Sequence, residues 1–181
     1  VHMTTTLAAY DGGPSAVRYP RGSGTGVDLP SEGDILTLGK GRILSHGQDI
    51  ALLSLGTMLS VAEEVADRLA DDGISVTLAD ARFAKPFDTE MLRSLASTHQ
   101  AMLIIEEGSS GGFSALVMQF LANEGLLDKG LRVRVATLPD SFIDHAERGR
   151  QLCLCGLDAK TLYERATALC ATAANSAAKR R

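Results

Sequence analysis

Two arginines flank a tyrosine–proline pair near the amino end of the chain, in the run Arg18-Tyr19-Pro20-Arg21-Gly22. A guanidinium offers a rigid fork of N–H donors that suits phosphate or carboxylate oxygens. Pro20 fixes the backbone ahead of Arg21, and Gly22 has no side chain to obstruct a ligand. Arg21 is therefore a candidate anion-binding residue, and a solvated basic loop is the alternative that these residues leave open.

A pair of carboxylates, Glu106 and Glu107, ends an apolar run and precedes the glycine- and serine-rich segment 108–112. That segment leads into a predicted helix, whose amino end favours anions. Neighbouring residues on a strand point to opposite faces, so the two carboxylates are not expected to converge as an acid and a base. We expect the pair to order the strand end and to contribute to an interface.

His145 follows Asp144, and this neighbourhood suggests acid–base chemistry because histidine titrates near neutral pH. Adjacent residues rarely orient one another as a dyad, and no nucleophilic serine motif accompanies them, so a structural loop is the better prediction. The chain has three cysteines, Cys153, Cys155 and Cys170. Their odd number and spacing fit neither a disulfide framework nor a zinc site, so we expect small apolar fillers, a reducing compartment and no metal site.

The composition of the 181-residue chain is globular, with 45% hydrophobic and 22% charged residues. Lys and Arg number 18 against 22 for Asp and Glu, a net charge of −4 that argues against a nucleic-acid partner. The longest apolar run, near residues 49–56, is too short to cross a bilayer, so no membrane partner is expected.

From residue 49 onward, apolar runs alternate with amphipathic segments. The sequence predicts strands over 50–55, 74–79, 101–106 and 132–136, and helices over 57–72, 88–98, 113–123 and 159–174. This alternation predicts an α/β protein with a three-layer α/β/α arrangement and a mostly parallel sheet. The strand over 132–136 alternates apolar and charged residues, so it is predicted near an edge of the sheet.

Several side chains are suited to end or begin these helices. Thr57, Asp88 and Asp158 are predicted N-caps, because each precedes a helical pattern and offers a side-chain oxygen to free N–H groups. Gly73 is predicted to close the first of these helices. His46 and His99 are expected at loop or helix-end positions.

The amino-terminal residues are predicted to belong to a different unit. Residues 3–10 have the pattern of the last turns of a helix, and residues 15–19 that of a short strand stopped by proline. We expect residues 1–22 to be the tail of a preceding domain, 23–46 a linker, 47–174 the α/β domain and 175–181 a disordered tail. Segment 39–47 fits a hairpin arm or an extended approach. No signal peptide is recognised, so the chain is expected to be a cytoplasmic fragment.

Several motifs taken in order resemble one family. The run 13–22 resembles the end of the pyrimidine-binding domain of the 1-deoxy-D-xylulose-5-phosphate synthase family. The resemblance continues with Asp80–Asp88, Glu106–Ser109, Gly111–Phe113, Leu138–Asp140, Phe142–His145 and Gly156–Ala159. It covers the chain except 175–181. Ser114 and Ala146 replace glycines that are common in the family, and neither position is expected to carry chemistry.

The resemblance implies a transketolase-like thiamine-diphosphate enzyme that acts as a homodimer and has a transketolase C-terminal domain at residues 47–174. Such an enzyme condenses pyruvate with D-glyceraldehyde 3-phosphate, releases CO2 and forms 1-deoxy-D-xylulose 5-phosphate for isoprenoid, thiamine and pyridoxal phosphate biosynthesis. The family's Tyr-Pro-Arg-Gly motif implies that Arg21 binds the phosphate of the aldehyde substrate. Thiamine diphosphate and Mg²⁺ are implied to bind upstream, so the fragment alone is expected to bind neither and to be inactive.

Two alternatives remain open. Transketolases and the β subunits of 2-oxoacid dehydrogenases share the implied fold, which cannot by itself distinguish them from the synthase. A stand-alone interaction or regulatory domain that starts at Met3 and binds a small anion at Gly111-Gly112 is the alternative from another functional class.

Overall fold

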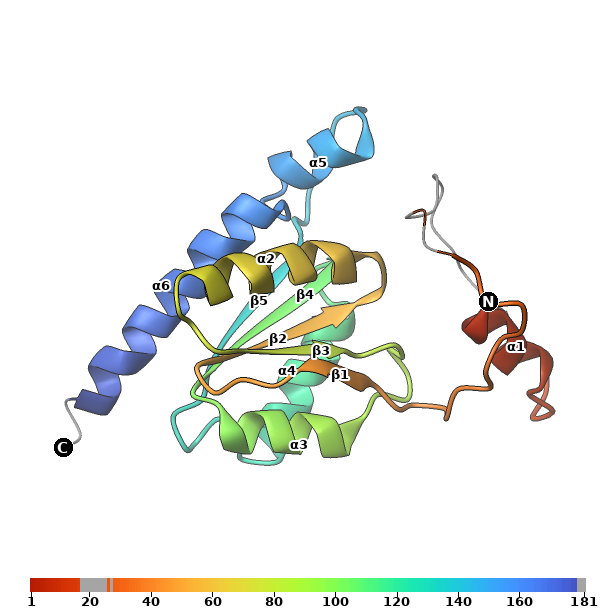
Figure 1. Ribbon diagram of the computed structural model, residues 1–181, viewed down its shortest axis with the longest axis horizontal. Coiled ribbons are helices and arrows are strands. Elements are labelled where there is room, and N and C mark those ends of the chain that lie inside the picture. The colour runs from red at the N-terminus through yellow and green to blue at the C-terminus, as the bar shows by residue number, and fades with distance from the viewer. Residues whose placement is uncertain (17–25, 27, 179–181) are drawn as a thin grey trace.

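The computed structural model describes residues 1–16, 26 and 28–178 of the chain. A five-stranded sheet of order β1-β3-β2-β4-β5 lies at its centre (Figure 1). β2, β3, β4 and β5 are parallel, and β1 pairs antiparallel with β3 at one edge. The strands are β1 Arg42–Ser45, β2 Ile50–Leu55, β3 Val76–Asp80, β4 Ala101–Ser109 and β5 Arg132–Leu138. The predicted α/β fold is confirmed, and β5 lies at the edge as expected.

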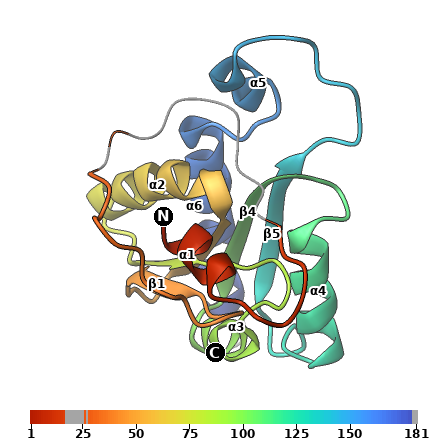
Figure 2. The ribbon, with the colours of Figure 1, turned by 90° about the vertical axis from the view of Figure 1, so that its right-hand side faces the viewer.

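Helices cover both faces of the sheet, α2 and α6 on one and α3 and α4 on the other (Figure 2). Alternate residues of β2 serve the two cores, since Leu52 packs beneath α2 and α6 while Leu53 packs beneath α3 and α4. A strand covered on both faces therefore has a continuous apolar sequence. The helices are α1 His2–Ala8, α2 Leu59–Asp71, α3 Thr89–Thr98, α4 Phe113–Asn123, α5 Arg148–Leu154 and α6 Ala159–Ala178, with a 3₁₀ turn at Gly56–Met58.

Three of the four residues predicted to cap helices do so in the structure. Asp88 accepts the Met91 N–H at 3.0 Å, and Asp158 accepts the Thr161 N–H at 3.1 Å. Gly73 has a φ of +78°, and the N–H groups of residues 73 and 74 bond back to carbonyls of α2, which is the Schellman arrangement.

The predicted N-cap role of Thr57 is wrong. The 3₁₀ turn over Gly56–Met58 precedes α2, which begins at Leu59 and has no side-chain cap. The Thr57 hydroxyl instead donates to Glu107 across the strand ends, at 2.6 Å. The alternative partner is distant in sequence, so the local pattern gave no sign of it.

Two helical segments differ from the sequence prediction. The seven-residue α5 was not anticipated, and Leu152 is its only buried residue, so it has almost no amphipathic signal. Helix α6 continues to Ala178 rather than ending near Ala174, so residues 175–178 of the predicted tail are helical. The alanine-rich sequence there contains neither glycine nor proline to stop the helix.

The amino-terminal helix α1 agrees with the predicted helix end and lies apart from the sheet (Figure 1). None of its residues is buried. Its hydrogen bonds join it to the following segment, where the Leu36 N–H donates to Thr6 Oγ1 at 2.8 Å. Segment 39–47 contains β1, so residues 42–45 of the predicted linker join the sheet. Among the described residues, no helix is long and apolar enough to cross a bilayer.

Candidate functional site

The carboxyl ends of β2 and β4 form the topological switch point of the sheet. From β2 the chain crosses to β3 on one side, and from β4 it crosses to β5 on the other. Open α/β sheets bind ligands in the crevice between two such diverging connections. The residues at this point are Gly56 and Thr57 after β2 and the two glutamates near the end of β4.

The carboxylate of Glu106 lies at the amino end of helix α4. Its side chain is 4% exposed and accepts the N–H of Phe113 at 3.1 Å and that of Ser114 at 2.7 Å. A Cβ at Gly112 would lie 2.8 Å from the carboxylate, so this approach requires glycine. The anion that the amino end of α4 favours is therefore supplied by the protein itself.

The side chain of Glu107 points to the opposite face of β4 from that of Glu106. Its hydrogen bonds join β4 to the turn after β2 and to helix α5. It accepts the Thr57 hydroxyl at 2.6 Å and the Arg148 Nε at 3.1 Å, and Arg148 Nη2 bonds its second oxygen. Burial opposes ionisation, but the bonds from Arg148 and Thr57 outweigh it and lower the pKa of the carboxyl. A hydrogen bond and an ion pair thus join Thr57, Glu107 and Arg148 at the switch point. The two glutamates diverge and order the strand end, in agreement with the geometry expected from the sequence.

The other candidate residues of the carboxyl half are not brought together. Asp144 and His145 are exposed in the loop between β5 and α5, and no interaction joins their side chains within the described ranges. Cys155 and Cys170 pack against the core as expected, whereas Cys153 is exposed, so its predicted role as an apolar filler is wrong. No pattern in the sequence indicates which face of the short α5 is buried.

Arg21, the predicted phosphate-binding residue, lies in segment 17–25, outside the described residues. The predicted strand at Ser15–Tyr19 falls mostly in the same segment. The role of Arg21 therefore stays a prediction.

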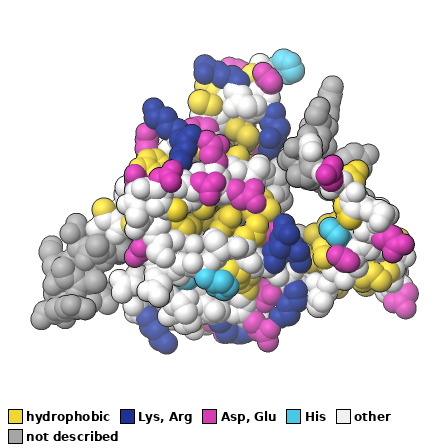
Figure 3. All heavy atoms as spheres, in the orientation of Figure 1, with side chains coloured by type: hydrophobic (Ala, Val, Ile, Leu, Met, Phe, Trp, Pro, Cys, Tyr) yellow, Lys and Arg dark blue, Asp and Glu magenta, His cyan; other side chains and the backbone are white. Residues whose placement is uncertain are grey.

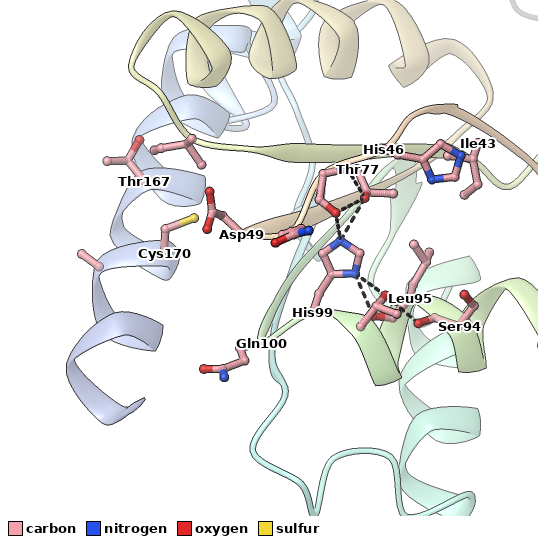
Figure 4. Close-up of a pocket in the computed structure, with 15 residues that line it drawn as sticks. Ile43, His46, Asp49, Thr77, Ser94, Leu95, His99, Gln100, Thr167 and Cys170 are labelled. Carbon is pink, nitrogen blue, oxygen red and sulfur yellow. Dashed lines mark hydrogen bonds between the residues drawn. The ribbon is translucent and has the colours of Figure 1, made fainter. Parts of the chain in front are cut away.

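A cavity of about 1090 Å³ lies at the opposite edge of the sheet, where the parallel strands begin (Figure 4). His99 and Thr77 are buried polar residues on its wall: His99 Nε2 is 2.9 Å from Thr77 Oγ1, and His99 Nδ1 is 3.0 Å from the Leu95 carbonyl oxygen. Both ring nitrogens are thus engaged within the protein. Burial and the nearby Asp49 raise the pKa of the Cys170 thiol on the cavity wall, which disfavours the nucleophilic thiolate. The walls of the cavity are mainly apolar, and burial favours the neutral form of the Cys170 thiol on them.

A thiamine diphosphate site does not fit the described residues. Magnesium, which carries the diphosphate, prefers carboxylate and other oxygen ligands. No group of three or more His, Cys, Asp or Glu side chains that could hold a metal ion occurs among the residues that the structure describes. The side chains at the switch point bond one another instead.

The sheet topology defines an α/β domain, and the side chains of Glu106 and Glu107 bond the segments that surround the end of β4. A family model described as "Transketolase, C-terminal domain" matches residues 39–162, which is more than half of the chain. The chain therefore belongs to the transketolase C-terminal domain family, part of the transketolase-like, thiamine-diphosphate-dependent enzymes.

Among solved structures, the chain is similar to a protein titled "Split gene transketolase, inactive beta4 tetramer". The two are 28% identical with a TM-score of 0.66, and the match covers 74% of this chain and 44% of that one. This chain thus spans less than half the length of the protein it matches.

Proposed function

We propose that this chain is the C-terminal part of a 1-deoxy-D-xylulose-5-phosphate synthase. The observation that carries the proposal is the presence of the Tyr-Pro-Arg-Gly and Leu-Pro-Asp-x-Phe-Ile-Asp-His sequences on a chain with a transketolase C-terminal domain. The whole enzyme condenses pyruvate with D-glyceraldehyde 3-phosphate in the cytoplasm and acts as a homodimer. Thiamine diphosphate and Mg²⁺ are bound by its upstream domains and supply the decarboxylation chemistry.

Within that enzyme, Arg21 binds the phosphate of the aldehyde by charge-assisted hydrogen bonds. The sheet domain packs against the other domains and supports the dimer. Exposed apolar side chains of the domain favour this role, since Phe142 is 107% exposed and Leu154 56%, and Leu29 at 76% and Ile35 at 67% extend the apolar surface into the segment before it. Such residues are suited to a surface that other parts of an enzyme cover.

The test compares CO2 release by the intact enzyme and its Arg21→Ala variant, with pyruvate, glyceraldehyde 3-phosphate, thiamine diphosphate and Mg²⁺. Loss of a charge-assisted bond worth about 1.5–3 kcal/mol raises KM for the aldehyde roughly 10- to 100-fold. KM for pyruvate stays unchanged. Arg134→Ala, a change at an arginine on the edge strand β5, is the matched control and leaves both values unchanged. Unchanged aldehyde kinetics in Arg21→Ala would remove Arg21 from the phosphate site while keeping the synthase.

A transketolase is the second candidate, favoured by the match to a protein with that title. It transfers a two-carbon unit between sugar phosphates without releasing CO2. Incubation with xylulose 5-phosphate and ribose 5-phosphate therefore separates the two enzymes. Sugar-phosphate exchange without CO2 release from pyruvate would replace the synthase assignment.

A further inference from the structure

Strand β5 is the last strand of the sheet, and no strand of the described residues pairs with its outer side (Figure 2). The Arg132 N–H donates to the Gln100 carbonyl oxygen at 2.9 Å, so residue 132 presents its backbone groups to β4. The backbone groups of successive residues alternate between the two sides of a strand in a parallel ladder. Those of Val133, Val135 and Thr137 therefore point outward, away from the sheet.

The outer side of β5 has the chemistry of a strand that can pair. The three residues with outward backbone groups are β-branched, a type enriched in strands. The side chain of Val135 is 37% exposed. An edge strand of this kind is a template for an extended strand of another chain. A second copy of this chain offers the same edge, and a twofold axis would join the two edges into one continuous sheet.

Two guanidinium groups lie on the outward carbonyl groups of β5. Arg165 Nη2, which comes from α6, donates to the Val135 carbonyl oxygen at 2.5 Å. Arg134 Nη1 donates to the Val133 carbonyl oxygen at 2.9 Å. Both acceptors belong to residues whose backbone groups point outward. A guanidinium bonded there also places its planar group and its positive charge where the second strand would lie.

The position of Arg165 is electrostatically unfavourable apart from this bond. Burial, together with the positive charge of the nearby Arg134, lowers the pKa of the Arg165 guanidinium. No ion pair joins either arginine to a carboxylate in the part of the chain that the structure describes. On the face that Figure 3 shows, by contrast, Lys and Arg side chains lie close to acidic ones over much of the surface. The outward carbonyl groups of β5 are thus the partners that hold these two like charges at the edge.

We propose that Arg165 and Arg134 mask the edge of β5 as an interaction surface, and that the partner this surface fits is β5 of a second copy of the chain. Loss of both guanidinium groups frees two outward carbonyl groups for strand pairing. The inference does not depend on which reaction the whole enzyme catalyses.

The test is the oligomeric state of the double variant Arg134→Gln/Arg165→Gln of the 181-residue chain, measured by light scattering from about 10 µM to about 1 mM. We expect its mass at the highest concentration to be about twice that of the unsubstituted chain, because two copies pair through β5. Either single substitution leaves one outward carbonyl masked, so it associates more weakly. The net charge of the double variant changes from −4 to −6, so general repulsion between copies increases and cannot itself cause association.

Lys160→Gln/Arg150→Gln is the matched control, because it removes two positive charges at exposed positions of α6 and α5 and leaves β5 masked. This control keeps the mass of the unsubstituted chain. Amide hydrogen exchange identifies the surface that pairs, since the Val133 and Val135 N–H groups gain roughly tenfold or more protection in the associated double variant.

Urea unfolding shows whether the double variant keeps its fold. Where it does not, Arg165→Gln alone is used, and protection of the Val135 N–H is expected to rise with protein concentration. An unchanged mass at every concentration, association without protection of the outward N–H groups, or equal association of the control would each overturn the proposal.

Discussion

Glu106→Gln tests whether the buried carboxylate at the end of β4 anchors helix α4. The substitution keeps the size of the side chain and removes its charge. Glutamine has one carbonyl oxygen and one NH2 group, so it accepts one of the two N–H groups that Glu106 now bonds. The NH2 group then faces the other backbone N–H, and because both groups are donors no hydrogen bond forms between them. A Cβ at Gly108 would lie 2.5 Å from Glu106 Oε2 and one at Gly112 2.8 Å from it, so the two glycines leave room for the side chain at position 106.

Two effects determine the expected loss in the free energy of unfolding: one charge-assisted hydrogen bond and the negative charge at the amino end of α4. The bond contributes about 1.5–3 kcal/mol, and loss of the negative charge near the amino end of α4 adds about 0.3–1 kcal/mol. We expect Glu106→Gln to lower the free energy of unfolding by about 2–4 kcal/mol. Glu106→Ala costs at least as much, because both N–H groups then lack their carboxylate.

Urea unfolding of the 181-residue chain measures this loss, with Glu63→Gln on the exposed face of α2 as the control. The control changes the free energy of unfolding by less than about 0.5 kcal/mol. Amide hydrogen exchange gives a local readout, since the protection of the Phe113 and Ser114 N–H groups falls in Glu106→Gln. A loss below about 0.5 kcal/mol with unchanged protection of these two amides would refute the capping role.

Three further substitutions test the ion pair at the end of β4 and the backbone at two glycines. The lowered pKa of Glu107 means that its bonds stabilise the folded chain above the unfolded carboxyl's value of 4.5, and that this contribution is lost as the pH falls through the lower folded value. Urea midpoints of Arg148→Gln should therefore fall less than those of the unsubstituted chain between about pH 5 and pH 3, and parallel curves would contradict this. Gly73→Ala should cost about 1–2 kcal/mol in urea unfolding because φ is +78°. Gly149→Ala in α5, where the new Cβ meets no atom within 4 Å, should instead stabilise by about 0.5–1 kcal/mol, and equal effects of the two changes would refute the backbone argument.

The elements with strong local signals could be predicted from the sequence. The strand Ile50–Leu55 is apolar except at Ser54 because both of its faces are covered, and Asp88 caps α3 within its own first turn. Both signals arise from residues adjacent in the chain. Helix α5 has a single buried residue, so neither hydrophobic periodicity nor a cap marked it. Its position depends on the contact of Arg148 with the distant Glu107.

Features of the candidate site could be predicted only where residues adjacent in the sequence determine the geometry. The opposite directions of Glu106 and Glu107 follow from the alternation of a strand. The convergence of Arg42 and Arg82 on Asp80 could not be predicted, because it requires the antiparallel pairing of β1 with β3 and a positive φ at Arg82. From the sequence, segment 39–47 could be either a hairpin arm or an extended approach to the sheet. The strand register that places Arg42 opposite Asp80 is a property of the folded sheet.

The carboxyl edge of the sheet thus has two parts with different electrostatics. At the end of β4, each carboxylate is matched by donors of the same chain, two N–H groups for Glu106 and a hydroxyl with a guanidinium for Glu107. At the end of β3, two guanidinium groups meet one carboxylate. A matched cluster costs free energy when a ligand displaces it. The matched donors therefore hold the two glutamates in place at the end of β4.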